Sequence, residues 1–188
     1  MKDSRELRAL ARSQLQGSWL PAVGMFLVYS IILCASGGVV VGPLVLGGPL
    51  LLGFLGYFLK KARGEFVRLE NLFDGFKLFG SCFLLYLLQA IFITLWTCLF
   101  IIPGIVKCFS YSMSFFILRD NPGIGASEAI TRSRQMMYGH KGQLFYLVLS
   151  FIGWGILCCF SFGIGFLWLV PYMALSVANF YEDLKNNS

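Results

Sequence analysis

Three long stretches without a charged residue limit the fold of this chain more than any other feature. They run from Ser13 to Leu59, from Leu78 to Val106 and from Gly142 to Tyr181. An α-helix needs about 20 apolar residues to cross the ~30 Å hydrocarbon core of a bilayer. The first and third stretches therefore have room for two such helices each. Only 13% of all residues are charged, whereas soluble domains have about 25%. The sequence predicts an all-α integral membrane protein.

Glycines and prolines divide the apolar stretches into six predicted spans. We expect them near residues 18–36, 43–59, 80–101, 104–118, 143–161 and 164–181. The fourth is short, at about 22 Å for a rise of 1.5 Å per residue. The first is expected to be a retained span rather than a signal peptide, because its apolar run continues well beyond ~15 residues. The sequence leaves open whether residues 37–49 form a re-entrant or an external loop.

The basic residues are unevenly distributed between the two sides that six spans would define. Every Lys and Arg except Lys107 falls in the N-terminus, in segments 60–79 and 119–141, or at the C-terminus. Segments rich in Lys and Arg next to membrane spans tend to stay in the cytoplasm. This pattern predicts that both termini and both segments are cytoplasmic, and that Lys107 lies on the outer side.

Each predicted pair of spans follows a segment with helical periodicity. Residues 4–16 place Arg5, Arg8 and Arg12 on one polar stripe, and Asp3 and Glu6 have the spacing of an N-terminal capping box. The segment 60–79 has an apolar stripe of Phe66, Leu69, Leu72, Phe73 and Phe76. The segment 124–138 has a face of Ala126, Ala129, Ile130, Ser133 and Met137. Such amphipathic helices tend to lie in the headgroup plane of a membrane.

This arrangement predicts one membrane domain over residues 1–188. It would contain six transmembrane helices as three hairpins, each preceded by a cytoplasmic amphipathic helix. The units would be residues 1–59, 60–123 and 124–188, in a threefold internal repeat. Arg12-Ser13 before Gly17 is similar to Arg132-Ser133 before Gly139.

Several short runs, in order along nearly the whole chain, carry a resemblance to a known family. They include residues 17–19, 99–107, 111–113, 133–137, 150–154, 163–165 and 179–181. On these runs the chain resembles the bacterial membrane family known as domain of unknown function 975. The resemblance implies a protein of the bacterial cytoplasmic membrane, and it implies no established activity.

Catalytic chemistry has little support in the sequence. The predicted spans contain no Asp or Glu, so they offer no intramembrane carboxylate for proton relay or ion binding. There is no GxSxG elbow and no phosphate-binding P-loop. The six cysteines lie in apolar runs without CxxC spacing and are expected to be small hydrophobic side chains. We therefore expect no catalytic, cofactor or metal site, and no enzyme.

Lys107 is the residue that points most directly to a ligand. One interpretation is a lysine whose ammonium reaches the outer interface. The alternative is an anion site, in which the ammonium works with the free N–H groups of a helix that starts at Pro103-Gly104. Further candidates for contact with lipid headgroups are His140, Lys141 and Arg132.

Two classes of function remain open. The first is a non-catalytic membrane module that binds lipid or a partner protein, and the missing catalytic set favours it. The second is a small transporter or lipid-translocating protein, and a membrane enzyme is a distant third. Basic segments next to a membrane attract anionic lipid, at about 1 kcal/mol per Lys or Arg. The expected partners are therefore membrane lipids, especially anionic ones, with a homo-oligomer or a membrane-protein partner also open and no nucleic acid.

Overall fold

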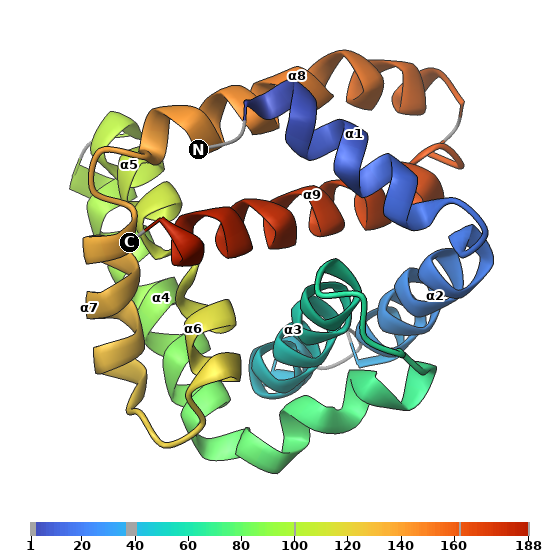
Figure 1. The fold of residues 1–188 in the computed structure, drawn as a ribbon. Coiled ribbons are helices and arrows are strands. Elements are labelled where there is room, and N and C mark those ends of the chain that lie inside the picture. The colour runs from blue at the N-terminus through green and yellow to red at the C-terminus, as the bar shows by residue number, and fades with distance from the viewer. Residues whose placement is uncertain (1–2, 37–40, 100, 162, 188) are drawn as a thin grey trace.

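Helices are the only regular elements in residues 3–36, 41–99, 101–161 and 163–187, which the computed structural model describes. The expected all-α fold class is therefore confirmed (Figure 1). The helices are α1 (Ser4–Leu15), α2 (Trp19–Ser36), α3 (Val41–Ala62), the 3₁₀ helix η1 (Leu69–Leu78), α4 (Phe79–Leu99), α5 (Ile101–Tyr111), α6 (Ser114–Asp120), α7 (Ala126–Met136), α8 (Lys141–Phe160) and α9 (Phe166–Asn186). The loop question at residues 37–49 falls partly outside the described residues, but residues 41–49 already belong to α3.

Four helical stretches among the described residues are long and apolar enough to cross a membrane. They are Trp19–Ser36, Val45–Ala62, Leu69–Cys98 and Lys141–Phe160, and they correspond to the first, second, third and fifth predicted spans. Large apolar side chains of α2, α4 and α8 point outward. Exposed apolar surface of this extent is typical of a protein that lies against lipid. The fold is therefore compatible with a membrane protein.

The fourth predicted span is not one helix. It is divided into α5, which ends at Tyr111, and α6, which begins at Ser114. At the break, the Ser112 hydroxyl donates to the carbonyl of Phe109 (2.8 Å), and the amide of Gln89 in α4 donates to the carbonyl of Tyr111 (2.9 Å). These side chains satisfy carbonyl groups at the end of α5, where the helical hydrogen bonding stops.

The sixth predicted span corresponds to α9, which lies at the centre of the molecule (Figure 1). Helices α1, α2, α3 and α8 all pack against it. Leu175, Ala178 and Phe180 are buried there, and full burial of a large apolar side chain stabilises a fold by about 1.5–3 kcal/mol. Asn179 is also buried, and its amide donates to the side-chain oxygen of Gln14 in α1 (2.8 Å). α9 is thus a core helix, surrounded by other helices over most of its surface.

Two of the short helices form as their sequences predict. α1 has the expected capping box: the Asp3 carboxylate accepts from the N–H of Ser4 (2.7 Å), and Glu6 accepts from the N–H of Asp3 (3.2 Å). In α7 the predicted small and apolar face is buried. Gly17 and Gly139 follow α1 and α7 with φ of 80° and 81°. Glycine adopts this left-handed conformation without steric cost, so the chain can turn from each short helix into the long one.

The segment between α3 and α4 departs from the predicted amphipathic α-helix. It contains the 3₁₀ helix η1, which runs directly into α4. Within the predicted apolar stripe, Leu72 is buried against α3, whereas Phe66, Leu69 and Phe73 are exposed. The second unit therefore differs from the first and third in its short helix and in its broken second span.

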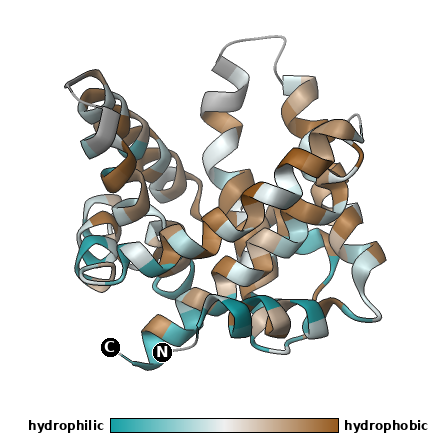
Figure 2. Ribbon diagram, turned by 90° about the horizontal axis from the view of Figure 1, so that it is seen from above, coloured by the Kyte–Doolittle hydropathy of each residue, from teal (hydrophilic) through white to brown (hydrophobic). Residues whose placement is uncertain are grey.

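We call the side of the molecule on which both termini lie the polar side (Figure 2). The Asp74 carboxylate of η1 contacts Lys60 (3.5 Å), Lys77 (2.8 Å) and Arg119 (3.0 Å). These contacts connect η1 with the last turns of α3 and α6. Figure 2 shows the hydrophilic ribbon on the side where both termini lie.

Candidate anion-binding pocket

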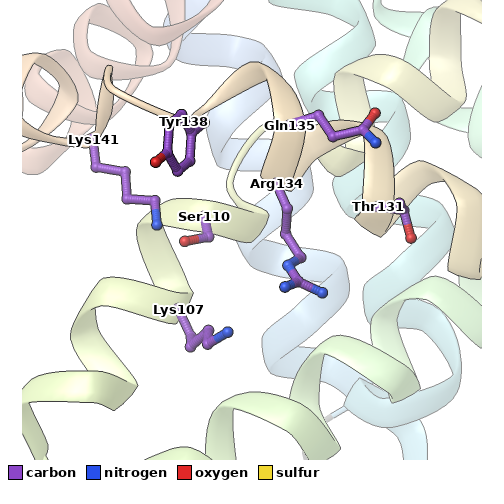
Figure 3. Close-up of a pocket in the computed structure, with 7 residues that line it drawn as sticks. All are labelled: Lys107, Ser110, Thr131, Arg134, Gln135, Tyr138 and Lys141. Carbon is purple, nitrogen blue, oxygen red and sulfur yellow. The ribbon is translucent and has the colours of Figure 1, made fainter.

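A pocket of about 630 Å³ lies between α5, α7 and the start of α8. We call it the α5–α7–α8 pocket. In Figure 3 the side chains of Lys141 and Arg134 extend toward α5, where Lys107 and Ser110 lie. The complete lining is Lys107, Ser110, Thr131, Arg134, Gln135, Tyr138 and Lys141.

Helical spacing places the polar groups of this pocket on one side of α7. Thr131, Arg134, Gln135 and Tyr138 follow the i, i+3, i+4, i+7 pattern of a single helix face. The other face of α7 is buried in the core. Burial of that face therefore leaves the polar stripe facing the pocket, which α5 and the beginning of α8 also line.

A buried hydrogen bond holds α7 against α5 beneath the pocket. The hydroxyl of Ser133 donates to the carbonyl of Ser110 (2.8 Å), and both serines are buried. A buried polar group without a partner is costly, so this contact stabilises the crossing of the two helices. The crossing brings Arg134, next to Ser133 in sequence, toward Lys107 on the preceding turn of α5.

Lys107 was expected on the opposite side from segment 119–141, but it lies beside two basic residues of that segment. It shares the pocket with Arg134 and Lys141, both of which belong to the basic segment 119–141. Its ammonium lies 4.7 Å from the ring centroid of Trp96 in α4, within the range of a cation–π contact. The physical reason is the packing of α7 across the second half of α5, a contact that hydropathy does not reveal.

The three cations of the pocket have no carboxylate partner among the described residues. Asp74, Asp120, Glu128 and Glu182 form their ion pairs elsewhere, and Lys107, Arg134 and Lys141 take part in none of them. Like charges held close together repel one another, so a bound anion would lower the energy of the group. The lining also offers the Tyr138 hydroxyl and the Gln135 amide as hydrogen-bond donors. The hydroxyls of Ser110 and Thr131 already donate to the carbonyls of Val106 and Ser127.

The other predicted site residues lie outside this lining. Pro103 and Gly104 are the third and fourth residues of α5, which begins at Ile101 rather than at Pro103-Gly104. Gly104 is buried against Thr97 of α4, so the helix start and the pocket are separate places. His140 is the residue before α8 and makes no side-chain cap. Arg132 donates to Glu128 on the same helix (2.6 Å).

Arg134 is the charged pocket residue that the sequence analysis did not single out. Its signal was present in the polar stripe of Thr131, Arg134, Gln135 and Tyr138, on the side of α7 opposite the predicted buried face. Among the described residues, no group of three His, Cys, Asp or Glu side chains could hold a metal ion. The chemistry that the lining offers is therefore recognition of a negatively charged group.

Comparison with known proteins identifies a family and nothing more specific. The model of the family described as Protein of unknown function (DUF975) matches residues 1–109 and residues 100–188, which together span the chain. No curated protein and no solved structure matches this chain. The resemblance noted in the short sequence runs is confirmed, and the chain belongs to the DUF975 family.

Proposed function

We propose that this protein is a non-catalytic membrane module that binds the phosphate group of an anionic lipid in the α5–α7–α8 pocket. The observation that carries the proposal is the grouping of three cations, Lys107, Arg134 and Lys141, without a carboxylate partner among the described residues. Phosphate oxygens accept strong, charge-assisted hydrogen bonds from Lys and Arg. The hydroxyl of Tyr138 and the amide of Gln135 would bind the remaining oxygens.

The proposed setting is the bacterial cytoplasmic membrane, with both termini in the cytoplasm. The asymmetry of Lys and Arg supports this orientation. In this orientation the pocket would lie at the level of the cytoplasmic headgroups. α5 alone is about 16 Å long at 1.5 Å per residue, which is about half the thickness of the hydrocarbon core.

The break between α5 and α6 favours a second candidate, a small transporter. Discontinuous helices beside a polar site are a common feature of transporters. Here the break lies at Ser112-Met113, close in sequence to the pocket residue Ser110. Transport would require the anion to cross the bilayer. Loss of a labelled anion from protein-containing vesicles, compared with protein-free vesicles, would distinguish this candidate from simple binding.

Native mass spectrometry with titrated phosphatidylglycerol tests lipid binding directly. Lys107→Met and Arg134→Gln each remove one cation and keep a flexible side chain. We expect each to weaken binding about fivefold, from about 1 kcal/mol per cation. Phosphatidylcholine, which has no net charge, should bind weakly to all forms.

Arg132→Gln is the matched control. Arg132 lies on the same helix as Arg134, but it pairs with Glu128 and does not line the pocket. Its replacement removes the same charge from the protein but none from the pocket, so lipid binding should change less than twofold. Equal lipid occupancy in the wild type, Lys107→Met and Arg134→Gln would refute the proposal.

A further inference from the structure

A second cavity, of about 610 Å³, lies between α1, α8 and α9. We call it the α1–α8–α9 groove. Figure 1 shows that α1 runs alongside α8 and α9. The groove shares no lining residue with the α5–α7–α8 pocket. Its lining includes Arg8, Arg12, Trp154, Leu157, Trp168 and Tyr172.

The groove has a basic part and a long apolar part. The guanidinium of Arg8 lies 6.0 Å from the ring centroid of Phe151 in α8, and its backbone carbonyl accepts from the hydroxyl of Tyr172 in α9 (3.1 Å). Arg8 is thereby located at the level of Phe151 and Tyr172. Beyond this level the lining follows α8 from Trp154 to Ser161, which is about 10 Å at 1.5 Å per residue. Trp154 and Leu157 of α8 and Trp168 of α9 give this part its apolar surface.

The two arginines retain unused hydrogen-bonding capacity. Arginine has five N–H donors. The side chain of Arg8 makes one hydrogen bond, a long contact of 3.4 Å from its Nε to the carbonyl of Ser4, and that of Arg12 makes none with the described residues. Neither arginine forms an ion pair within the described part of the chain. A pair of arginines one helical turn apart suits the oxygens of a phosphate.

We propose that this groove binds one anionic phospholipid molecule, with its phosphate at Arg8 and Arg12 and an acyl chain along Trp154, Leu157 and Trp168. Charge complementarity accounts for the first contact, and the apolar length of α8 and α9 accounts for the second. The lipid would lie between α1 and the α8–α9 hairpin and would connect them. The site is independent of the α5–α7–α8 pocket, because the two share no residue.

Photocrosslinking in nanodiscs tests this proposal. The probe is phosphatidylglycerol with a diazirine on its acyl chain, and mass spectrometry of peptides locates the crosslink. In the wild type we expect the lipid to crosslink to residues between Trp154 and Trp168. The yield of these crosslinks should be several-fold higher with this probe than with the matching phosphatidylcholine probe. This comparison needs no variant, so it holds even if a substituted protein folds poorly. Equal labelling of those residues by both probes would overturn the proposal.

Substitutions then separate this groove from the other pocket. Arg8→Gln with Arg12→Gln should reduce the crosslink at least about fivefold. Arg5→Gln removes a charge from the same helix at a position that does not line the groove, and it should change the crosslink less than twofold. Arg134→Gln should also leave it unchanged, even where it weakens binding at the α5–α7–α8 pocket. An equal loss in Arg5→Gln, or a loss in Arg134→Gln, would show that the groove is not a separate site.

Discussion

At the scale of single residues, Asp120 connects more separate parts of the chain than its position at the end of a short helix suggests. One carboxylate oxygen, Oδ2, accepts from Arg63 (2.7 Å), Lys185 (2.6 Å) and the hydroxyl of Tyr181 (3.0 Å). Its side chain is only 8% exposed. Arg63 also binds Glu182 (2.7 Å). The cluster therefore joins the chain after α3, the end of α6 and the last turns of α9.

Asp120→Asn should destabilise the fold by about 2–3 kcal/mol. It keeps the shape of the side chain but leaves Arg63 and Lys185 beside a neutral amide, and the loss of one partner in a largely buried pair is costly. Glu128→Gln is the control, because the Glu128–Arg132 pair is about half exposed and should contribute less than about 1 kcal/mol. Thermal unfolding in detergent micelles measures both changes, and equal shifts would contradict the role of burial.

The stabilisation by Asp120 should disappear in acid. Burial alone would raise the pKa of this carboxyl, but hydrogen bonds from Arg63 and Lys185 outweigh it and leave the pKa below its usual 3.8. A lowered pKa in the folded state contributes stability above the unfolded pKa, and this is lost as the pH falls through the folded pKa. The difference in unfolding temperature between wild type and Asp120→Asn should therefore be constant from pH 5 to 7 and narrow below pH ~4. A constant difference down to pH 2 would contradict this account.

At the scale of elements, the contact between α3 and η1 requires two glycines. A Cβ on Gly53 would lie 2.6 Å from the carbonyl carbon of Leu72, and a Cβ on Gly75 would lie 2.8 Å from that of Pro49. Both obstacles are backbone atoms, which cannot move aside as the end of a side chain can. The absence of side chains on these glycines lets the two helix backbones touch.

Gly53→Ala and Gly75→Ala should each destabilise the protein by about 1–3 kcal/mol, because the added methyl group overpacks a close backbone contact. Gly80→Ala is the control. A Cβ there meets nothing within 4 Å, and alanine favours the helical conformation by up to about 1 kcal/mol. Thermal unfolding of the three variants should give a lower midpoint for the first two alone. Unchanged midpoints for all three would mean that η1 does not pack closely on α3.

At the scale of the whole molecule, the basic residues have one consistent distribution. The ion pairs of Asp74 and Asp120 connect the chain after α3, the end of α6 and the C-terminal helix. Lys107, the one residue that the sequence assigned to the opposite side, shares a pocket with Arg134 and Lys141. Under the proposed cytoplasmic orientation of the polar side, Lys107 therefore does not depart from the distribution of the other basic residues.

Labelling of single cysteines with an impermeant thiol reagent tests this orientation. Cys98 is exposed near the end of α4, and Ser127 is exposed on α7. In a background without other cysteines, Cys98 should react in intact cells, whereas Ser127→Cys should react only after the membrane is opened. The reverse result would invert the topology, and reaction of both in intact cells would exclude the six-span arrangement.

The amino-acid sequence by itself determined the features that depend on neighbouring residues. Hydropathy located α2, α3, α4 and α8, because each needs only a run of apolar side chains. The capping box of α1 and the buried face of α7 followed from spacings of three or four residues. The same local patterns marked Lys107 and Lys141 as candidate anion ligands, and the structure brings these two together.

Only the tertiary structure decided which distant segments meet. The central place of α9, the end of α5 against Gln89 and the approach of Arg134 to Lys107 all depend on how helices cross. The groove between α1 and the α8–α9 hairpin joins residues near the two ends of the chain. Hydropathy and helical spacing describe one helix at a time. Crossing geometry depends on side chains of both helices, such as Ser133 on Ser110 and Gly75 on Pro49, which are far apart in sequence.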